Sequence, residues 1–89
     1  MDRQRIDKWL WHARMVRTRT DAAKLTEAGF VRLNGARVAQ PSHAVKLGDV
    51  VTLALDHSVR VVKVEGFCER RGQAAAARAL YRDMTRQTG

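Results

Sequence analysis

An Asn34-Gly35 pair constrains the fold of this sequence more than any other local feature. It lies between two short segments, residues 30–33 and 36–38, in which apolar and polar side chains alternate. Both central residues of a type I′ turn need positive φ, and Asn-Gly meets that need at little steric cost. The pair therefore predicts a β-hairpin, and with it the beginning of an antiparallel sheet.

Two helical patterns precede the hairpin. The first is predicted over residues 7–16, where apolar residues recur at the spacing of one helical face: Ile6, Trp9, Leu10, Ala13 and Val16. The second is predicted to begin near Thr18 or Thr20, because Thr18-x-x-Asp21 resembles a capping box. Gly29 is a suitable stop, since it accepts positive φ. A narrow stripe of Ala22, Leu25 and Ala28 favours close packing of the two helices.

The rest of the chain is predicted to add strands and a last helix. Strands are expected at residues 45–47, 50–55 and 59–65, with a β-bulge where Val61 and Val62 stand side by side. Residues 1–4 read as a polar lead-in and residues 40–44 as a loop. High helix propensity predicts a terminal helix over residues 73–84, and residues 85–89 are expected to fray. The fold class is α+β: two N-terminal helices on a small antiparallel sheet, plus a C-terminal helix.

The charge of the chain points to a polyanionic partner. It has 89 residues and a formal net charge of +8, with +5 on residues 1–37 and +3 on residues 38–89. No apolar run approaches the roughly 20 residues of a membrane span, and the N-terminus lacks the apolar core of a signal peptide. The single cysteine, Cys68, excludes an internal disulfide and is interpreted as a buried or idle thiol. A cytoplasmic protein without membrane contact is expected.

The sequence offers little support for catalysis. The three histidines lack metal-ligand spacing, so no metal is expected. The six glycines are dispersed, and none opens a helix after a strand as a phosphate-binding loop requires. We therefore predict a protein that is not an enzyme and carries no cofactor.

Binding of an anion is better supported, at the predicted turn between the two helices. Arg17, Thr18 and Arg19 lie there, beside the free backbone N–H groups and positive dipole end of the second helix. Arginine suits phosphate because its planar fork reaches two oxygens at once. Arg5, Lys8 and Arg14 extend the charge along the first helix, and Arg37 extends it from the hairpin. Arg14 and Arg17 have a second interpretation, as cations that favour the end of the first helix.

The two tryptophans have different predicted roles. Trp9 falls on the apolar stripe of the first helix and is expected in the core. Trp11 lies nearer the basic face, where it either packs against the protein or stacks on an unpaired base.

An ordered set of these residues resembles the S4-type RNA-binding domain over residues 3–66. The set is Arg5-Ile6-Asp7-Lys8-Trp9-Leu10-Trp11, Arg14, Thr18-Arg19, Ala22, Gly29, Val31, Asn34-Gly35, Val38 and Gly48-Asp49. Within that superfamily the Asp-Lys-Trp-Leu-Trp run, residues 69–72 and residues 79–81 are similar to the ribosome-associated heat shock protein 15 family. The resemblance implies an alpha-L motif over residues 3–66, and residues 67–89 are then a C-terminal extension with one helix.

The resemblance also implies a function. It implies binding of structured ribosomal RNA on the large ribosomal subunit, with a stalled nascent chain still held on tRNA, and so a role in recycling or rescue under stress. Carried over residue by residue, the RNA-facing set is Arg5, Lys8, Arg14, Arg17, Thr18, Arg19 and Asn34, to which the charge argument adds Arg37.

Two other functions stay open. One is a protein–protein interaction module, or an accessory subunit of an RNA-modifying enzyme, with residues 73–84 as the contact surface. The other is duplex DNA binding, which we do not expect, because the second predicted helix carries Asp21 and Glu27 on the element that would enter the groove. A monomer is expected.

Overall fold

The computed structural model describes residues 2–85. Within these residues, three helices and seven strands follow one another in a mixed order. They are β1 (Arg3–Arg5), α1 (Ile6–His12), α2 (Arg19–Glu27), β2 (Val31–Leu33), β3 (Ala36–Arg37), β4 (Ala44–Lys46), β5 (Val50–Leu55), β6 (Ser58–Val64), α3 (Ala74–Arg78) and β7 (Tyr81–Asp83).

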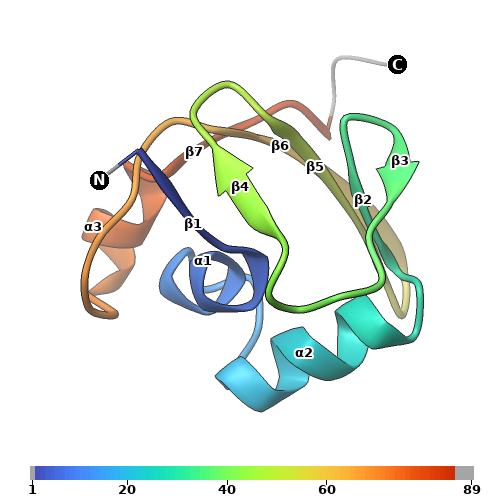
Figure 1. Cartoon of the computed structure of the whole chain (residues 1–89). Coiled ribbons are helices and arrows are strands. Elements are labelled where there is room, and N and C mark those ends of the chain that lie inside the picture. Colours follow the sequence, from blue (N-terminus) through green and yellow to red (C-terminus); the bar gives the residue numbers. More distant parts are fainter. Residues whose placement is uncertain (1, 86–89) are drawn as a thin grey trace.

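The strands form two antiparallel sheets. One is the pair β1–β4, and the other has five strands in the order β3-β2-β5-β6-β7. In Figure 1, α1 and α2 lie below the strands, and the apolar face of α1 meets the sheets from that side. Trp9, Ile6 and Leu10 of α1 are fully buried together with Val51 and Leu53 of β5. The predicted core role of Trp9 is confirmed, and its indole N–H donates to the carbonyl of Gly66 at 3.0 Å.

Helix α1 is shorter than predicted, and the prediction that it runs to Val16 is wrong. Arg14 adopts a φ of 59°, which no helical residue has. The amide N–H of Arg14 donates to Trp11 O (3.1 Å) and that of Met15 donates to Leu10 O (3.0 Å), which together form a Schellman motif. Val16, the one residue of the apolar stripe beyond Ala13, packs against the core from outside the helix.

Helix α2 begins and ends where its sequence predicts. The Thr18 side chain accepts from the Asp21 N–H at 3.0 Å, so Thr18 is the N-cap residue. At the other end Gly29 has a φ of 89°, and Phe30 N donates to Leu25 O at 3.1 Å in a second Schellman motif. Glycine takes this conformation without the steric cost that a Cβ brings.

The Asn34-Gly35 hairpin is confirmed, with φ values of 52° and 85° at the two turn residues. The strands pair with Leu33 opposite Ala36. The expected β-bulge in β6 is wrong, since β5 and β6 pair residue for residue from Val50↔Lys63 to Leu55↔Ser58. Val61 lies on the opposite face of the sheet from the buried Val62, so two adjacent valines need no irregularity.

Both ends of the described chain differ from their predictions. Residues 3–5 are a strand and not a lead-in, because β1 pairs with β4 in the register Gln4↔Val45. The predicted helix over residues 73–84 is limited to α3, and β7 follows it. The free edge of β6 takes up β7, with Val64 opposite Tyr81, and these ladder bonds override local helix propensity. Residues 86–89, the last part of the predicted C-terminal extension and of the segment expected to fray, lie outside the described residues.

Candidate RNA-binding surface

A buried carboxylate ties together the beginnings of α1 and α2. Asp7 is 3% exposed, yet its two oxygens accept from Arg5 Nε (3.1 Å) and Nη2 (3.0 Å), and from the Lys8 amide N–H (2.7 Å). The Nε of Arg19 lies 3.5 Å from the same carboxylate. Two guanidinium groups that are 14 positions apart in the sequence therefore share one anion, and the pair keeps an excess of positive charge at the surface.

The residues that join the two helices form a candidate anion site. We call Arg17, Thr18 and Arg19 the helix junction; all three are exposed. The Thr18 oxygen accepts from Asp21 N, so its hydroxyl proton is still able to donate. The first intrahelical bond runs from Ala22 N to Thr18 O, which leaves the amides of Arg19 and Thr20 at the positive end of the helix dipole. This combination suits a phosphate oxygen.

Lys8 lies one helical turn from a buried histidine. Its side chain is half-buried, whereas His12 is 1% exposed. Burial lowers the pKa of His12 below its ordinary value, and the charges of Lys8, Arg19 and Arg71 lower it further. The Cys68 backbone offsets part of this effect without forming a hydrogen bond of good geometry to either ring nitrogen. His12 is therefore a neutral side chain beneath the basic surface.

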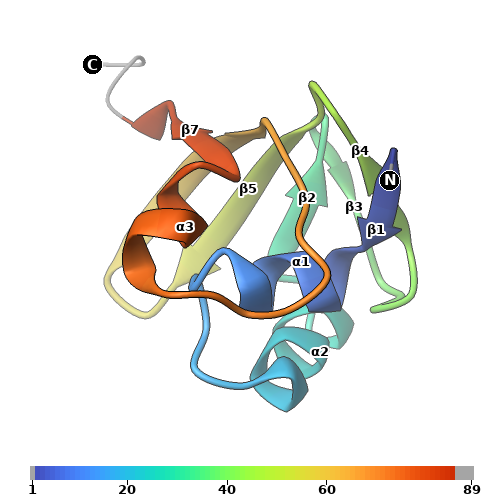
Figure 2. The same ribbon diagram turned by 90° about the vertical axis from the view of Figure 1, so that its left-hand side faces the viewer.

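Arg14 lies at the C-terminal end of α1, where its guanidinium contacts the protein's own backbone. Its Nε and Nη2 donate to the carbonyl of Gly72 at 3.1 and 2.9 Å. Gly72 belongs to what we call the strap, residues 66–72, which crosses α1 in Figure 2 before entering α3. The side chain of Arg14 is exposed, but part of its donor capacity holds the strap.

Arg71 on the strap is a residue that sequence reasoning missed. Its Nε donates to Trp11 O at 3.0 Å and its Nη2 to Val16 O at 3.4 Å. Its guanidinium carbon lies 5.6 Å from the centre of the Trp11 ring, within cation–π range. Trp11 is half-buried under this contact, with its ring centre 5.3 Å from that of His12. No local pattern signals a bond between residues 60 positions apart.

Asn34 and Arg37 lie away from the helix junction. The Asn34 side chain donates to Asp49 Oδ1 (3.1 Å) and accepts from Val50 N (2.9 Å), so it clamps two turns at the end of β2 that is distant from α2 (Figure 1). The guanidinium of Arg37 fills the space where a Cβ at Gly29 would lie. Arg37 therefore lies near the C-terminal end of α2, whereas the helix junction lies at its N-terminal end.

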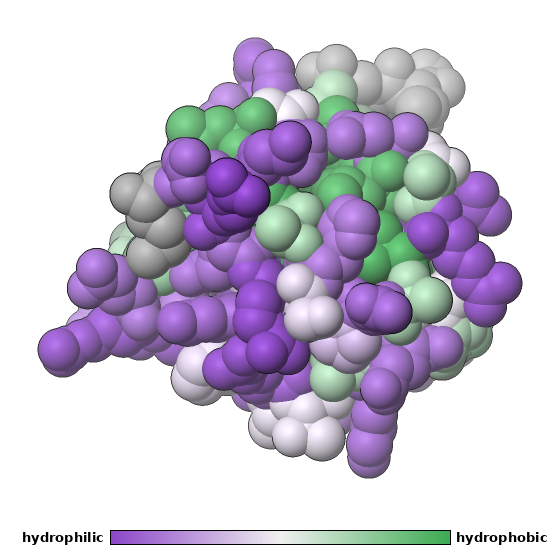
Figure 3. Space-filling view, viewed as in Figure 1, coloured by the Kyte–Doolittle hydropathy of each residue, from purple (hydrophilic) through white to green (hydrophobic). Residues whose placement is uncertain are grey.

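The surface over the helices differs in hydropathy from the surface over the strands. The lower part of Figure 3, over α1 and α2, is mostly hydrophilic, and hydrophobic residues gather higher up, over the strands.

Within residues 2–85 no three His, Cys, Asp or Glu side chains are placed to hold a metal ion. Burial raises the pKa of the Cys68 thiol, which keeps it protonated. Among these residues no helix is long and apolar enough to cross a membrane.

Comparison with known proteins identifies the class. The sequence profile of the S4 domain matches residues 4–51, which include α1, α2, the Asn34-Gly35 hairpin and the Asp7 carboxylate. The chain belongs to the S4 domain family.

Its relatives place it more narrowly. The solved structure of trimeric heat shock protein 15 from Vibrio cholerae superposes with a TM-score of 0.85 at 39% identity, covering 92% of this chain and 82% of that one. Heat shock protein 15 of Escherichia coli K12 is 40% identical over 79 residues, 89% of this chain. Within the S4 family, the chain is a member of the heat shock protein 15 group.

The matches cover only part of the relatives' own length. The chain spans 59% of the length of the Escherichia coli protein that it matches. A more distant relative, the RQC P-site tRNA stabilizing factor of Listeria innocua, is 33% identical over 61 residues, which are 68% of this chain and 65% of that protein.

Proposed function

We propose that this protein is a non-catalytic, cytoplasmic RNA-binding protein that recognises structured ribosomal RNA on the large ribosomal subunit, where a stalled nascent chain awaits recycling or rescue. The observation that carries the proposal is the helix junction, with exposed Arg17 and Arg19, a free hydroxyl proton on Thr18 and the unbonded amides at the start of α2. The names of the relatives, heat shock protein 15 and a P-site tRNA stabilizing factor, support the ribosomal setting.

The proposed surface has a centre and a margin. Arg5, Lys8 and the helix junction form the centre, since Asp7 orients Arg5 and Arg19 on the same side of the molecule. Arg14 contributes the donors that Gly72 does not use. Arg37 extends the surface to the far end of α2, and Asn34 acts by holding the turn in shape.

The proposal is tested by where the protein migrates. Extract from cells that produce the chain is sedimented through a sucrose gradient at low salt, and the fractions are probed for the protein. Migration with free large subunits is expected, and an Arg17→Ala, Arg19→Ala double variant should shift to the top. A wild-type protein found only at the top would overturn the proposal.

One observation favours a second candidate, a protein–protein interaction module or accessory subunit of an RNA-modifying enzyme. Ala74, Ala75 and Ala76 of α3 are exposed, and small side chains permit close approach of a partner. We propose a monomer for the RNA-binding function, although the Vibrio cholerae relative was solved as a trimer. Size-exclusion chromatography with and without RNA separates the two, since a stable oligomer indifferent to RNA favours the second. Competition between ribosomal RNA and duplex DNA tests the preference for RNA.

A further inference from the structure

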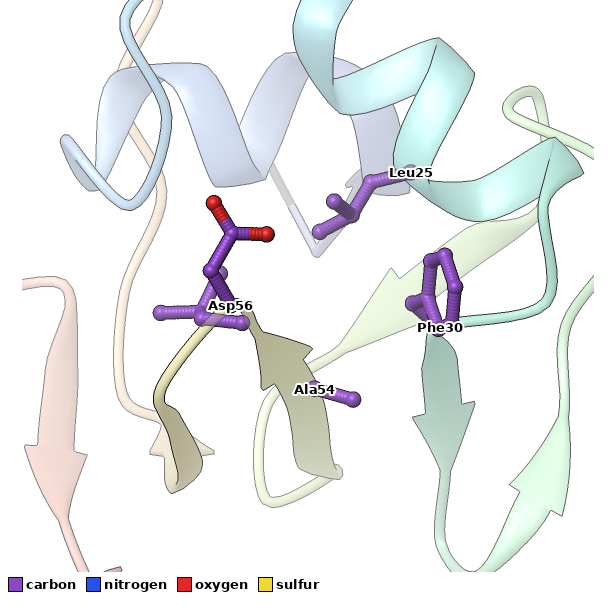
Figure 4. A pocket seen from close by; sticks show the side chains of 5 residues that line it. Leu25, Phe30, Ala54 and Asp56 are labelled. Atoms are coloured by element: carbon purple, nitrogen blue, oxygen red, sulfur yellow. The ribbon is translucent and has the colours of Figure 1, made fainter.

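A hollow near the C-terminal end of α2 is lined by residues that are not part of the helix junction. It has a volume of about 290 Å³ and is lined by Leu25, Phe30, Ala54, Leu55 and Asp56. That is near the lower limit of small-ligand pockets, about 300 Å³, so it suits a single ring system. Figure 4 shows Leu25 of α2 above the hollow, Ala54 of β5 below it, and Asp56 and Phe30 on its two sides.

Two of these side chains are unusual for a surface hollow. Phe30 is 50% exposed, although an aromatic ring of this size is normally covered. Asp56 is exposed and makes no hydrogen bond or ion pair within the part of the chain that the structure describes. The hollow therefore combines an uncovered aromatic ring with a carboxylate whose two oxygens are both free to accept.

We propose that this hollow receives one unpaired guanine of the bound RNA, with a face of the base against Phe30 and its Watson–Crick edge on Asp56. Guanine presents two adjacent donors on that edge, the N1–H and the N2 amino group, which match the two carboxylate oxygens. Adenine and cytosine each place a ring-nitrogen acceptor beside a single donor group, and uracil places carbonyls on both sides of its donor. Stacking on an aromatic side chain and hydrogen bonding of a splayed base are common in RNA recognition.

The surroundings fit a nucleotide better than an apolar peptide. The guanidinium of Arg37 lies against Gly29, which precedes Phe30 in the chain, and exposed Lys24 precedes Leu25. These cations are placed to neutralise the phosphates on either side of an inserted base. Helix α2 has nine residues, a length of about 13 Å, so the helix junction and the hollow lie within reach of one RNA strand. The inference rests on the proposed function.

The first test compares RNA hairpins that differ in a single bulged nucleotide: guanine, adenine or inosine, which lacks the N2 amino group. Wild-type protein should bind the guanine hairpin about 10-fold more tightly than the adenine hairpin, with inosine between them. Asp56→Asn should reduce the guanine preference to within about 2-fold. Glu27→Gln is the matched control, because it removes the same charge from exposed Glu27 and should leave the preference intact.

A second variant and a second probe separate the possible failures. Phe30→Leu should weaken binding of all the bulged hairpins by about 10-fold and leave an unbulged hairpin unaffected. Guanosine monophosphate, but not adenosine monophosphate, should shift the NMR amide signals of residues 25, 30 and 54–56. This probe decides the inference even if the gradient test overturns the proposed function.

Three results would overturn the inference. One is an equal affinity for guanine and adenine hairpins while Arg19→Ala still weakens both, which would leave the proposed function standing. Another is the absence of shifts around the hollow with guanosine monophosphate. The third is self-association of the protein that Phe30→Leu abolishes, which would make the hollow a protein contact.

Discussion

Arginines gather at both ends of α1, but they have different partners there. At the N-terminal end Arg5 and Arg19 share the single carboxylate of Asp7, and Arg17, two positions before Arg19, has no side-chain partner within residues 2–85. At the C-terminal end Arg14 and Arg71 donate to backbone carbonyls and so hold the strap over the helix. At one end Arg17 is left without a side-chain partner among the described residues, and at the other end the backbone holds both guanidinium groups.

The comparison separates charge that binds from charge that stabilises. A guanidinium that already donates to carbonyl oxygens has fewer N–H groups left for a phosphate, whereas a guanidinium without a partner, such as that of Arg17, can present all of them. We therefore expect substitutions at the two ends of α1 to affect different measurements. Those at the helix junction should lower RNA affinity, and those at the strap should lower the free energy of unfolding.

The largest effect is expected from the double substitution Arg17→Ala, Arg19→Ala. Each phosphate contact should add a slope of about −0.9 to the dependence of log affinity on log salt, which is about 8-fold in affinity at 0.1 M. Loss of two contacts should weaken binding by about 60-fold, or roughly 2.5 kcal/mol. Fluorescence anisotropy with labelled RNA measures it. Arg82→Ala, at an exposed position on β7, is the control. An equal loss in the control would mean that only net charge matters.

Arg71→Ala should have the next largest effect, on stability. It removes two charge-assisted bonds to carbonyls and the contact with Trp11, at a cost of about 2 kcal/mol. Urea denaturation of this variant and of Arg70→Ala gives a matched pair, since exposed Arg70 has no side-chain partner within residues 2–85 and its substitution should change stability by less than about 0.5 kcal/mol. Equal stabilities of the two variants would contradict a structural role for the strap arginine.

Thr18→Ala should affect both measurements, each moderately. Loss of the N-cap bond to Asp21 N costs about 1 kcal/mol of stability, and loss of the hydroxyl removes a donor to phosphate. Thr18→Ser keeps the oxygen and should restore both. If serine restores stability without restoring RNA affinity, the hydroxyl is not at the interface.

The smallest effect is a pH dependence that originates beneath the basic surface. The pKa of His12 is lowered from 6.5 in the folded protein, so below pH 6.5 the unfolded chain binds a proton that the folded chain does not. The contribution of His12 to the free energy of unfolding should therefore be fully present above pH 6.5. It should be lost as the pH falls from 6.5 toward the lowered pKa. The slope should vanish in His12→Gln and persist in His57→Gln, which changes an exposed histidine. Identical slopes in the two variants would assign the titration elsewhere.

Features fixed by neighbouring residues could be predicted from the sequence. The Asn34-Gly35 turn, the Thr18 cap and the buried Trp9 each depend on a few adjacent positions. The end of α1 could not be predicted, because positive φ at Arg14 follows from tertiary contacts and not from its residue type. Strand β7 was also missed, since its pairing with β6 overrides an alanine-rich helical pattern.

The candidate site shows the same division between local and distant contacts. Arg17, Thr18 and Arg19 could be named because they form one run before a helix. The role of Asp7 in holding Arg19 could not, because the pair closes only when α1 and α2 pack together. Arg71 and the hollow around Asp56 likewise depend on residues brought together from different elements.

The salt dependence of RNA affinity tests the central claim most directly. For a surface that neutralises five phosphates, log affinity should fall with log salt at a slope of roughly −4 to −5. Arg19→Ala should make that slope shallower by about one unit, and Arg70→Ala should leave it unchanged. A wild-type slope near zero, or a slope that Arg19→Ala does not alter, would contradict the assignment of the helix junction as the RNA-binding surface.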